Sequence, residues 1–215
     1  MDLRCARCSY SPGMQPHDEP VRFQAPLPAD LDPAQRAVHD AIAGGPRASA
    51  ARVLPLTDED GRLLGPFGPM LLSPPVGGAL QELGARLRYG TGLSDRAREL
   101  AVLLVAAHED SAFERYAHEL LGRQVGVTEV ELAELRRVQV PPLDDPYERA
   151  TTDAVQALLL RGDLDDAEFA DVQGSLGTAV LFELMTLVGY YRTLALQLRV
   201  LRIGAPDGTS ATAGG

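Results

Sequence analysis

The sequence predicts an all-α protein of about six to eight helices. Apolar residues recur at spacings of three and four along most of the chain, and no segment shows sustained alternation with a period of two. Helix start and stop signals also follow one another at short intervals. We therefore expect a helical domain over residues 31–203, with a disordered leader over residues 1–30 and a flexible tail over residues 204–215.

Most predicted helices begin at a recognisable cap. Asp32 before Pro33 starts the first helix, and the sequence Gly-Gly-Pro over residues 44–46 ends it. The later helices are expected to start at Pro74, after Ser94, after Asp110, after Thr128 with Glu131 in a capping box, after Asp145, after Asp163 or Asp165, and at Gly177. Residues 46–72 are irregular but contain apolar residues among prolines and glycines, so we expect this segment to line an internal surface.

The charged residues exclude several classes of function. The chain has no lysine, so all 20 of its positive charges are arginines, which excludes a Schiff-base lysine, a lysine-anchored pyridoxal phosphate and a Walker-type phosphate loop. The net charge of −10 argues against nucleic acid or an anionic membrane as a partner. No apolar run approaches the roughly 20 residues of a membrane span, and the N-terminus lacks the apolar core of a signal peptide. We therefore expect a cytoplasmic protein.

The only two cysteines, Cys5 and Cys8, form a CxxC pair in the expected leader. A zinc site needs about four ligands, and His17 is the only candidate nearby. A redox-active pair usually opens a helix, whereas the sequence Ser-Pro-Gly over residues 11–13 prevents one here. We expect neither a metal nor a cofactor.

Glu99 lies at the start of an apolar run over residues 101–107. That run is apolar all around the helix, so the helix is expected to be buried on most sides. Burial raises the pKa of a carboxyl group and makes it suited to proton transfer near neutral pH. The alternative is an ion pair with Arg96 or Arg98 at the start of a helix.

A second candidate group lies on one stripe of the next predicted helix. Ser111, Glu114 and His118 follow one another at spacings of three and four, so Glu114 and His118 can touch. A carboxylate on one ring nitrogen fixes the tautomer and leaves the other nitrogen free to exchange a proton. A surface or capping pair is the alternative interpretation. A metal site is disfavoured because the helix offers two ligands, and His108 adds a third only if its turn folds inward.

Three motifs resemble one known family. The elements RELAVLLVA, FERYAH and QVGVTEVELAEL are similar to those of the carboxymuconolactone decarboxylase family, which is related to alkyl hydroperoxidase D. The likeness extends from about Leu31 through VLFELMTLVGYYRTLALQL. The resemblance implies an alkyl hydroperoxidase D-like helical bundle and a homo-oligomer, either a trimer or a hexamer.

The peroxidase branch of this superfamily uses a glutamate followed by CxxCxxxH. On this chain the glutamate is Glu99 and the histidine is His118, while Ser111 and Glu114 occupy the two cysteine positions. These two residues cannot form a disulfide, so the resemblance argues against thiol peroxidase chemistry at this site. The decarboxylase-like branch carries a glutamate four residues before the histidine, as FERYAH does.

The resemblance therefore implies cofactor-independent decarboxylation of a small carboxylated lactone, such as 4-carboxymuconolactone in aromatic-acid catabolism. Our hypothesis is that His118, oriented by Glu114, donates or relays a proton to the carbanion left by CO2. Glu99 is a second member of the relay, and Ser111 joins it or holds a water. The candidates for binding a substrate carboxylate are Arg88, Arg96 and Arg115.

Other functions remain open on the sequence. Another reaction of a small oxygenated acid, such as isomerisation or hydrolysis, is one alternative. A peroxidase is another, and a Cys5→Ser/Cys8→Ser variant that retains activity would show that those thiols are not its catalysts. The third is a non-catalytic helical assembly, since Tyr190, Tyr191 and the apolar segment 179–201 offer a large hydrophobic surface.

Overall fold

The computed structural model describes residues 21–45, 47 and 54–206. Its α-helices are α1 (Pro33–Ala43), α2 (Pro74–Tyr89), α3 (Asp95–His108), α4 (Ala112–Gln124), α5 (Glu129–Leu135), α6 (Pro146–Arg161), α7 (Asp166–Leu176) and α8 (Thr178–Leu201), with 3-10 helices η1 (Pro28–Asp30) and η3 (Gly65–Leu72). The only strand-like pairing within the described ranges is one isolated bridge between Thr57 and Leu63. The prediction of an all-α fold is confirmed.

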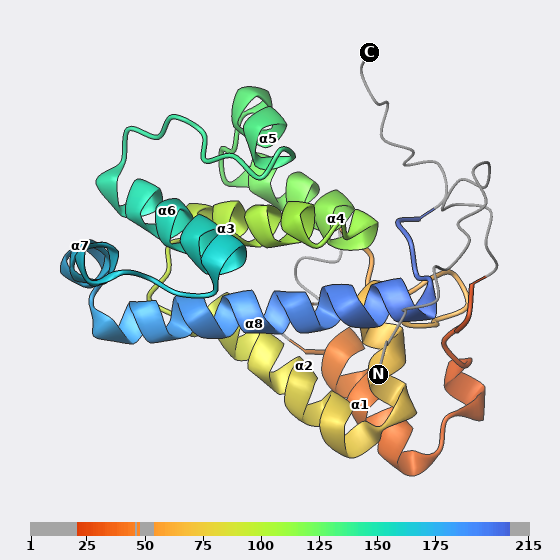
Figure 1. Cartoon of the computed structure of the whole chain (residues 1–215). Coiled ribbons are helices and arrows are strands. Elements are labelled where there is room, and N and C mark those ends of the chain that lie inside the picture. Colours follow the sequence, from red (N-terminus) through yellow and green to blue (C-terminus); the bar gives the residue numbers. More distant parts are fainter. Residues whose placement is uncertain (1–20, 46, 48–53, 207–215) are drawn as a thin grey trace, which may run out of the picture.

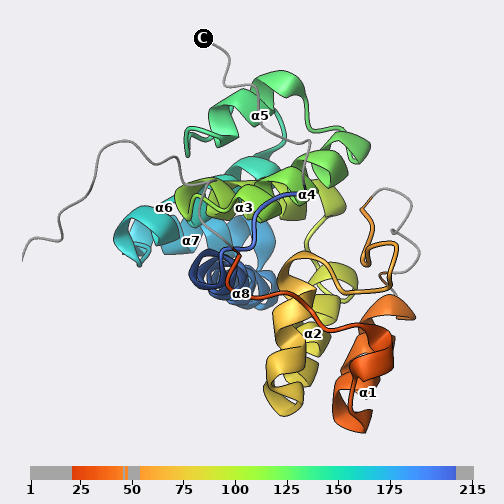
Figure 2. The same cartoon turned by 90° about the vertical axis from the view of Figure 1, so that its right-hand side faces the viewer.

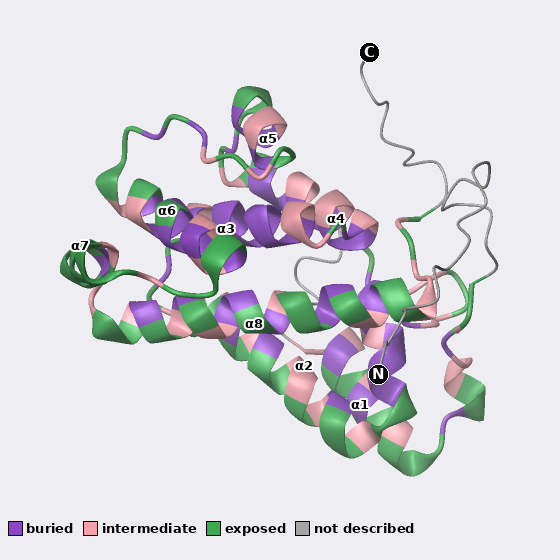
Figure 3. Ribbon diagram, in the orientation of Figure 1, coloured by how far each residue is buried: buried purple, intermediate pink, exposed green. Residues whose placement is uncertain are grey.

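Helix α3 is the centre of the molecule. It packs against α4, α5, α6 and α8, and Figure 3 shows it buried along most of its length. Every residue from Ala97 to Ala106 is buried, because the run AVLLVAA has no polar side to turn towards water. Burial of the segment before this run carries Glu99 into the interior as well.

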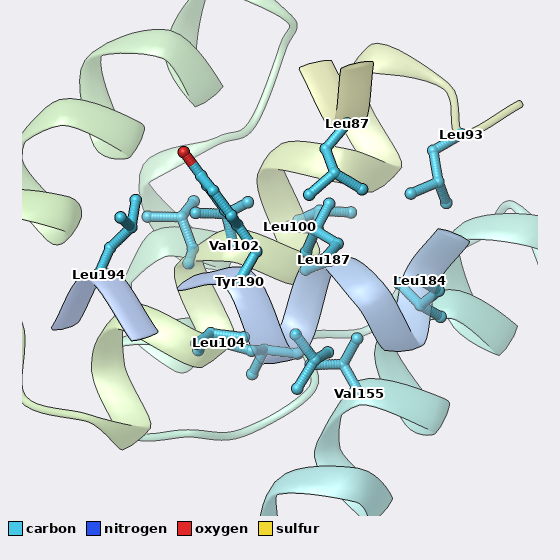
Figure 4. Packing of buried hydrophobic residues seen from close by; sticks show 14 of the residues in the cluster. Leu87, Leu93, Leu100, Val102, Leu104, Val155, Leu184, Leu187, Tyr190 and Leu194 are labelled. Atoms are coloured by element: carbon cyan, nitrogen blue, oxygen red, sulfur yellow. The ribbon is translucent and has the colours of Figure 1, made fainter. Parts of the chain in front are cut away.

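Helix α8 runs the length of the molecule between two groups of helices. In Figure 1 it lies below α3 and α4 and above α1 and α2, and Figure 2 shows it nearly end-on between the same groups. Figure 4 shows Leu184, Leu187 and Leu194 of α8 among the core side chains of α2 and α3. Contrary to the expectation from sequence, this helix is long and apolar enough to suit a membrane span. A central core helix has the same length and composition.

Five predicted helix starts are confirmed by their caps. The side chains of Asp32, Ser94, Thr128, Asp145 and Asp165 each accept a hydrogen bond from a backbone N–H of the following turn. The prediction that Asp110 caps α4 is wrong.

Asp110 instead makes the turn that joins α3 to α4. Its φ is 49°, and Ser111 occupies the N-cap position without a side-chain hydrogen bond. The chain reverses between His108 and Ala112 and needs a residue in the left-handed region there. Aspartate tolerates that conformation better than most residues.

The two predicted tails lie mostly outside the described residues, which exclude 1–20 and 207–215. The described part of the expected leader is packed rather than free. The backbone N–H of Arg22 donates to the carbonyl of Leu201 at 3.1 Å, its guanidinium donates to the carbonyl of Val200 at 3.1 Å, and Ala25 is buried. The packed part of the chain therefore begins before residue 31.

Candidate active site

A pocket opens between α2, α4, α8 and the irregular segment before α2, with a cavity volume of about 70 Å³. Its polar lining includes Arg47, Arg88, Glu114, His118, Tyr190 and Tyr191. The segment 54–67 contributes apolar lining through Leu54, Leu56, Pro66 and Phe67. This agrees with the expectation that the irregular segment lines an internal surface.

A short contact between Glu99 of α3 and His118 of α4 lies beside this pocket. His118 Nδ1–H donates to Glu99 Oε2 at 2.6 Å, and the two residues are 5% and 1% exposed. Arg88 Nη1 donates to the other oxygen of Glu99 at 3.3 Å, and Arg98 Nε lies 3.7 Å from it. Because α3 is buried at the centre of the molecule, the Glu99 carboxylate lies among the side chains of His118, Arg88 and Arg98.

The pKa of Glu99 is lowered, which is opposite to the expectation from its burial. Burial alone would raise it, but the charges of His118, Arg88 and Arg98 and the hydrogen bond from His118 outweigh burial. Glu99 is therefore an anion at neutral pH. It positions and charges His118 rather than supplying a proton.

His118 carries the opposite shift. Burial would lower its pKa, but Glu99 and Glu114 together raise it to about 9. The imidazole is consequently protonated at neutral pH. The ring of Tyr191 packs edge-on against it, with centroids 5.1 Å apart, and keeps this imidazolium in a hydrophobic surrounding.

Glu114 faces the second ring nitrogen of His118. Its Oε2 lies 3.4 Å from Nε2, and its Oε1 is buried with no hydrogen-bond partner among the described residues. The sequence hypothesis had Glu114 orienting the ring, whereas Glu99 makes the short contact that does so. Ser111 Oγ is also buried without such a partner, and Ser111 is not part of the pocket lining.

Of the three arginines considered for substrate binding, only Arg88 lines the pocket. Arg96 pairs instead with Glu131 and Glu148, which joins α3 to α5 and α6. Arg115 lies 3.9 Å from the exposed side chain of Asp110. Helix direction explains both cases, because these two side chains leave their helices on faces that point away from the pocket.

Sequence reasoning missed Arg47 and misplaced the tyrosine pair. Arg47 is buried and hydrogen-bonds to Gln81 of α2, 34 residues away. Tyr190 and Tyr191 line the pocket instead of forming an outer surface, with ring centroids 5.3 Å apart. No local pattern marks the contact of Arg47 with Gln81 or the position of Tyr190 against Gly84, since both join distant segments. Helix packing explains the glycine at position 84, because a Cβ there would lie 2.1 Å from Tyr190 Oη.

No group of three or more metal-binding side chains occurs among the described residues. At and beside the pocket, His118, Glu99, Glu114 and Arg88 form an ion-paired cluster of one imidazole, two carboxylates and one guanidinium. Such a cluster can hold an anion and transfer a proton.

Residues 74–157 match the model of the carboxymuconolactone decarboxylase family. No curated protein matches the chain. Among solved structures, uncharacterized peroxidase-related proteins from Ralstonia eutropha and from Silicibacter sp. are similar to it, at 15% and 16% identity and TM-scores of 0.66 and 0.65. These likenesses cover 88% and 89% of this chain and 94% of each of those chains.

The debrominase Bmp8 is a further structural neighbour, with 11% identity, a TM-score of 0.64, and coverage of 86% of this chain and 91% of that chain. At these identities the neighbours show the fold, and the fold of the Ralstonia protein is described as an alkylhydroperoxidase AhpD core. The family match spans Arg88, Glu99, Glu114 and His118. Residues 74–157 are therefore similar to the carboxymuconolactone decarboxylase family, and the chain has an AhpD-like all-α fold.

Proposed function

We propose that this protein is a cofactor-independent decarboxylase of a small carboxylated lactone, with 4-carboxymuconolactone as the first candidate substrate. The observation that carries the proposal is the buried His118 ring, which contacts Glu99 through Nδ1 while Nε2 faces Glu114 at the pocket. The family match supports it, and the debrominase among the structural neighbours supports enzymatic chemistry in this fold.

The reaction needs a proton donor more than any other group. When the bond between the ring carbon and the carboxylate breaks, CO2 leaves. The electron pair of the broken bond stays on the ring carbon and is delocalised through the ring double bond to the lactone carbonyl. That anion must then be protonated on carbon. His118 is charged at neutral pH and gives its Nε2 proton, after which Glu99 holds the neutral ring in place and solvent returns the proton.

Arg88 and the apolar walls assist in different ways. Arg88 donates a hydrogen bond to Glu99. Because its guanidinium also lines the pocket, its positive charge favours the negative charge that develops on the lactone oxygen. The apolar side chains around the pocket exclude water and strengthen these interactions.

The size of the pocket sets a condition on binding. A cavity of about 70 Å³ has room for about two waters at roughly 30 Å³ each. A lactone with two carboxylates is larger, so the lining side chains must move apart when it binds. In the lining, Leu54 is partly buried and Tyr89 is exposed, so these two side chains have fewer contacts to lose than the buried ones.

Thiol peroxidase chemistry has less support than decarboxylation. Serine and glutamate stand at positions 111 and 114, and none of the described residues is a cysteine. Cys5 and Cys8 lie outside the described residues.

The test is turnover of 4-carboxymuconolactone, followed as loss of ultraviolet absorbance and release of CO2. We expect His118→Ala to lower turnover by about 100-fold or more, as removal of a general acid does. The matched control is His108→Ala, a histidine at the end of α3 outside the pocket lining, which should keep near-normal turnover. A loss of less than about tenfold in His118→Ala would refute the role of His118. No turnover by the wild type would remove this substrate.

A further inference from the structure

The pocket contains a guanidinium that forms no ion pair with any described carboxylate. Arg47 is 7% exposed, and it donates to the side-chain oxygen of Gln81 at 3.2 Å and to its carbonyl at 2.9 Å. The guanidinium also lies over the ring of Phe67, 5.4 Å from its centroid. All of these partners are neutral. A buried cation is costly without an opposite charge, and Glu114, the carboxylate in the pocket lining, makes no ion pair with Arg47 and faces His118 instead.

Tyr190 completes a donor pair with Arg47. Both side chains reach the backbone of α2 at Gly84, where a Cβ would lie 2.1 Å from Tyr190 Oη and 2.8 Å from Arg47 Nη2. Burial raises the pKa of Tyr190 to about 12, despite the opposing charge and hydrogen bond of Arg47. The phenol therefore keeps its proton. A guanidinium beside a phenol hydroxyl offers several N–H and O–H donors to one anion.

This donor pair lies across the tyrosine rings from the acid–base cluster. Tyr190 packs edge-on against Tyr191, and Tyr191 packs in the same way against His118. Arg47 and His118 line the same cavity, so a ligand anchored at Arg47 extends along the two rings towards His118.

We propose that Arg47 and Tyr190 bind the carboxylate that the substrate retains, which makes the substrate an unsaturated ring acid with a second, permanent carboxylate arm. This inference rests on the proposed function. The departing carboxylate loses its charge as CO2 forms, so a guanidinium bound to it would stabilise the ground state more than the transition state. The retained carboxylate keeps its charge throughout, and an arginine can anchor it without opposing the reaction.

The proposal departs from the sequence hypothesis, which considered Arg88, Arg96 and Arg115 for this role. Arg88 is already engaged by Glu99, and the other two lie outside the pocket. Arg47 and Tyr190 also lie outside the region that matches the family, residues 74–157. Recognition of the substrate and the acid–base step thus come from different parts of the chain.

The test is calorimetric binding of two acids, each compared with its own uncharged methyl ester. The probes are (5-oxo-2,5-dihydrofuran-2-yl)acetate, which lacks the departing carboxylate, and phenylacetate, a different ring with the same arm. We expect the wild type to bind at least one acid about tenfold or more tightly than its ester, the value of a charge-assisted hydrogen bond. Arg47→Met should bind acid and ester equally.

Two further variants separate the role of Arg47 from effects on folding. Arg86→Met also removes one positive charge, but from a side chain on α2 that is 79% exposed. This variant should keep the wild-type preference for acid over ester. Arg47→Lys retains the charge but loses the planar fork, so it should keep only part of that preference. A purely structural Arg47 would weaken acid and ester binding to the same extent, which would overturn the proposal.

The remaining outcomes also decide it. Equal acid preference in the wild type and in Arg47→Met would overturn the proposal, and so would an absence of acid preference in the wild type. If lactone turnover depends on His118 but the acid preference does not depend on Arg47, the proposed function stands and this inference fails. If the preference depends on Arg47 but no lactone is turned over, the carboxylate site stands and the lactone function fails.

Discussion

His118 is the residue on which most of the chemistry depends, and its charge can be measured directly. We predict that its ring titrates near pH 9 by NMR, because Glu99 and Glu114 outweigh the effect of burial. Glu99→Gln should lower this pKa more than Glu114→Gln does, since Glu99 is 2.6 Å from the ring and Glu114 is 3.4 Å from it. With His118 as the proton donor, turnover falls as pH rises through about 9. A wild-type midpoint near 6.5, or an equal effect of the two variants, would contradict this account.

The same pair predicts a pH window for stability. The pKa of His118 is raised above its ordinary value of 6.5, so its contribution is complete below pH 6.5 and is lost as pH rises towards 9. The pKa of Glu99 is lowered below 4.5, so its contribution is complete above pH 4.5 and is lost as pH falls. The stability advantage of the wild type over Glu99→Gln should therefore be largest between about pH 4.5 and 6.5.

Urea denaturation across this range measures the advantage. A His118 shift from 6.5 to about 9 corresponds to a contribution on the order of 3 kcal/mol. An advantage that grows between pH 7 and 9 would have the wrong sign and would contradict the ion pair.

At this scale the sequence reveals contacts within one helix and misses those between segments. The contact of Glu114 with His118 follows from their spacing of four. Glu99 is 19 residues from His118 on another helix, and only the family resemblance brought them together. Arg47 has its partners 20 and more residues away, at Phe67 and Gln81, so no local pattern could place it in the pocket.

At the scale of elements, two neighbouring glycines of α2 provide a matched pair. A Cβ at Gly77 would lie 1.9 Å from the backbone oxygen of Met70 in η3, whereas a Cβ at Gly78 would meet only Val38 Cγ2 at 3.6 Å. Gly78→Ala should therefore stabilise the protein by about 0.5–1 kcal/mol, the helix preference of alanine over glycine. Gly77→Ala must push α2 away from η3 and should destabilise it by about 1–3 kcal/mol.

Urea unfolding of the two variants gives both changes in free energy. Similar effects of the two substitutions would show that α2 does not pack on η3 as closely as the structure has it. The close approach also bears on function, since η3 and α2 both contribute to the pocket lining through Phe67 and Arg88.

The element boundaries show what sequence signals can specify. The caps at Asp32, Ser94, Thr128 and Asp145 were predictable because the same side chain that starts the helix satisfies its free N–H groups. Asp110 satisfies a turn instead, and aspartate favours both turns and caps. Whether an aspartate forms a turn or caps a helix depends on the path of the chain at that point. At Asp110 the packing of α4 against α3 decides this path.

On the scale of the whole molecule, the pocket combines two kinds of contribution. The family-matched region supplies Arg88, Glu99, Glu114 and His118, and the flanking regions supply the Arg47 end and the two tyrosines. Helix α8 joins them, since it packs on α3 with its core leucines and presents Tyr190 and Tyr191 to the pocket. The core that stabilises the fold therefore also positions the site.

The ion pairs of Arg96 distinguish such structural support from direct participation. Arg96 of α3 pairs with Glu131 of α5 and Glu148 of α6, and its side chain is 23% exposed. We predict that Arg96→Met destabilises the protein by roughly 3 kcal/mol at pH 7, because two largely buried carboxylates lose their common partner. Turnover per folded molecule should stay close to the wild-type value, since Arg96 does not line the pocket.

Unfolding in urea and turnover of the folded fraction together check this prediction, with the exposed Arg86→Met as the control for loss of a positive charge. The deficit of Arg96→Met should shrink as pH falls. Burial already raises the pKa of Glu148, while Thr128 and Arg96 lower the pKa of Glu131 against its burial, so the variant's unpaired carboxylates take up protons first. Normal stability with a large loss of substrate affinity would instead place Arg96 at the substrate, as the sequence had suggested, and would require that α3 turn towards the pocket when the substrate binds.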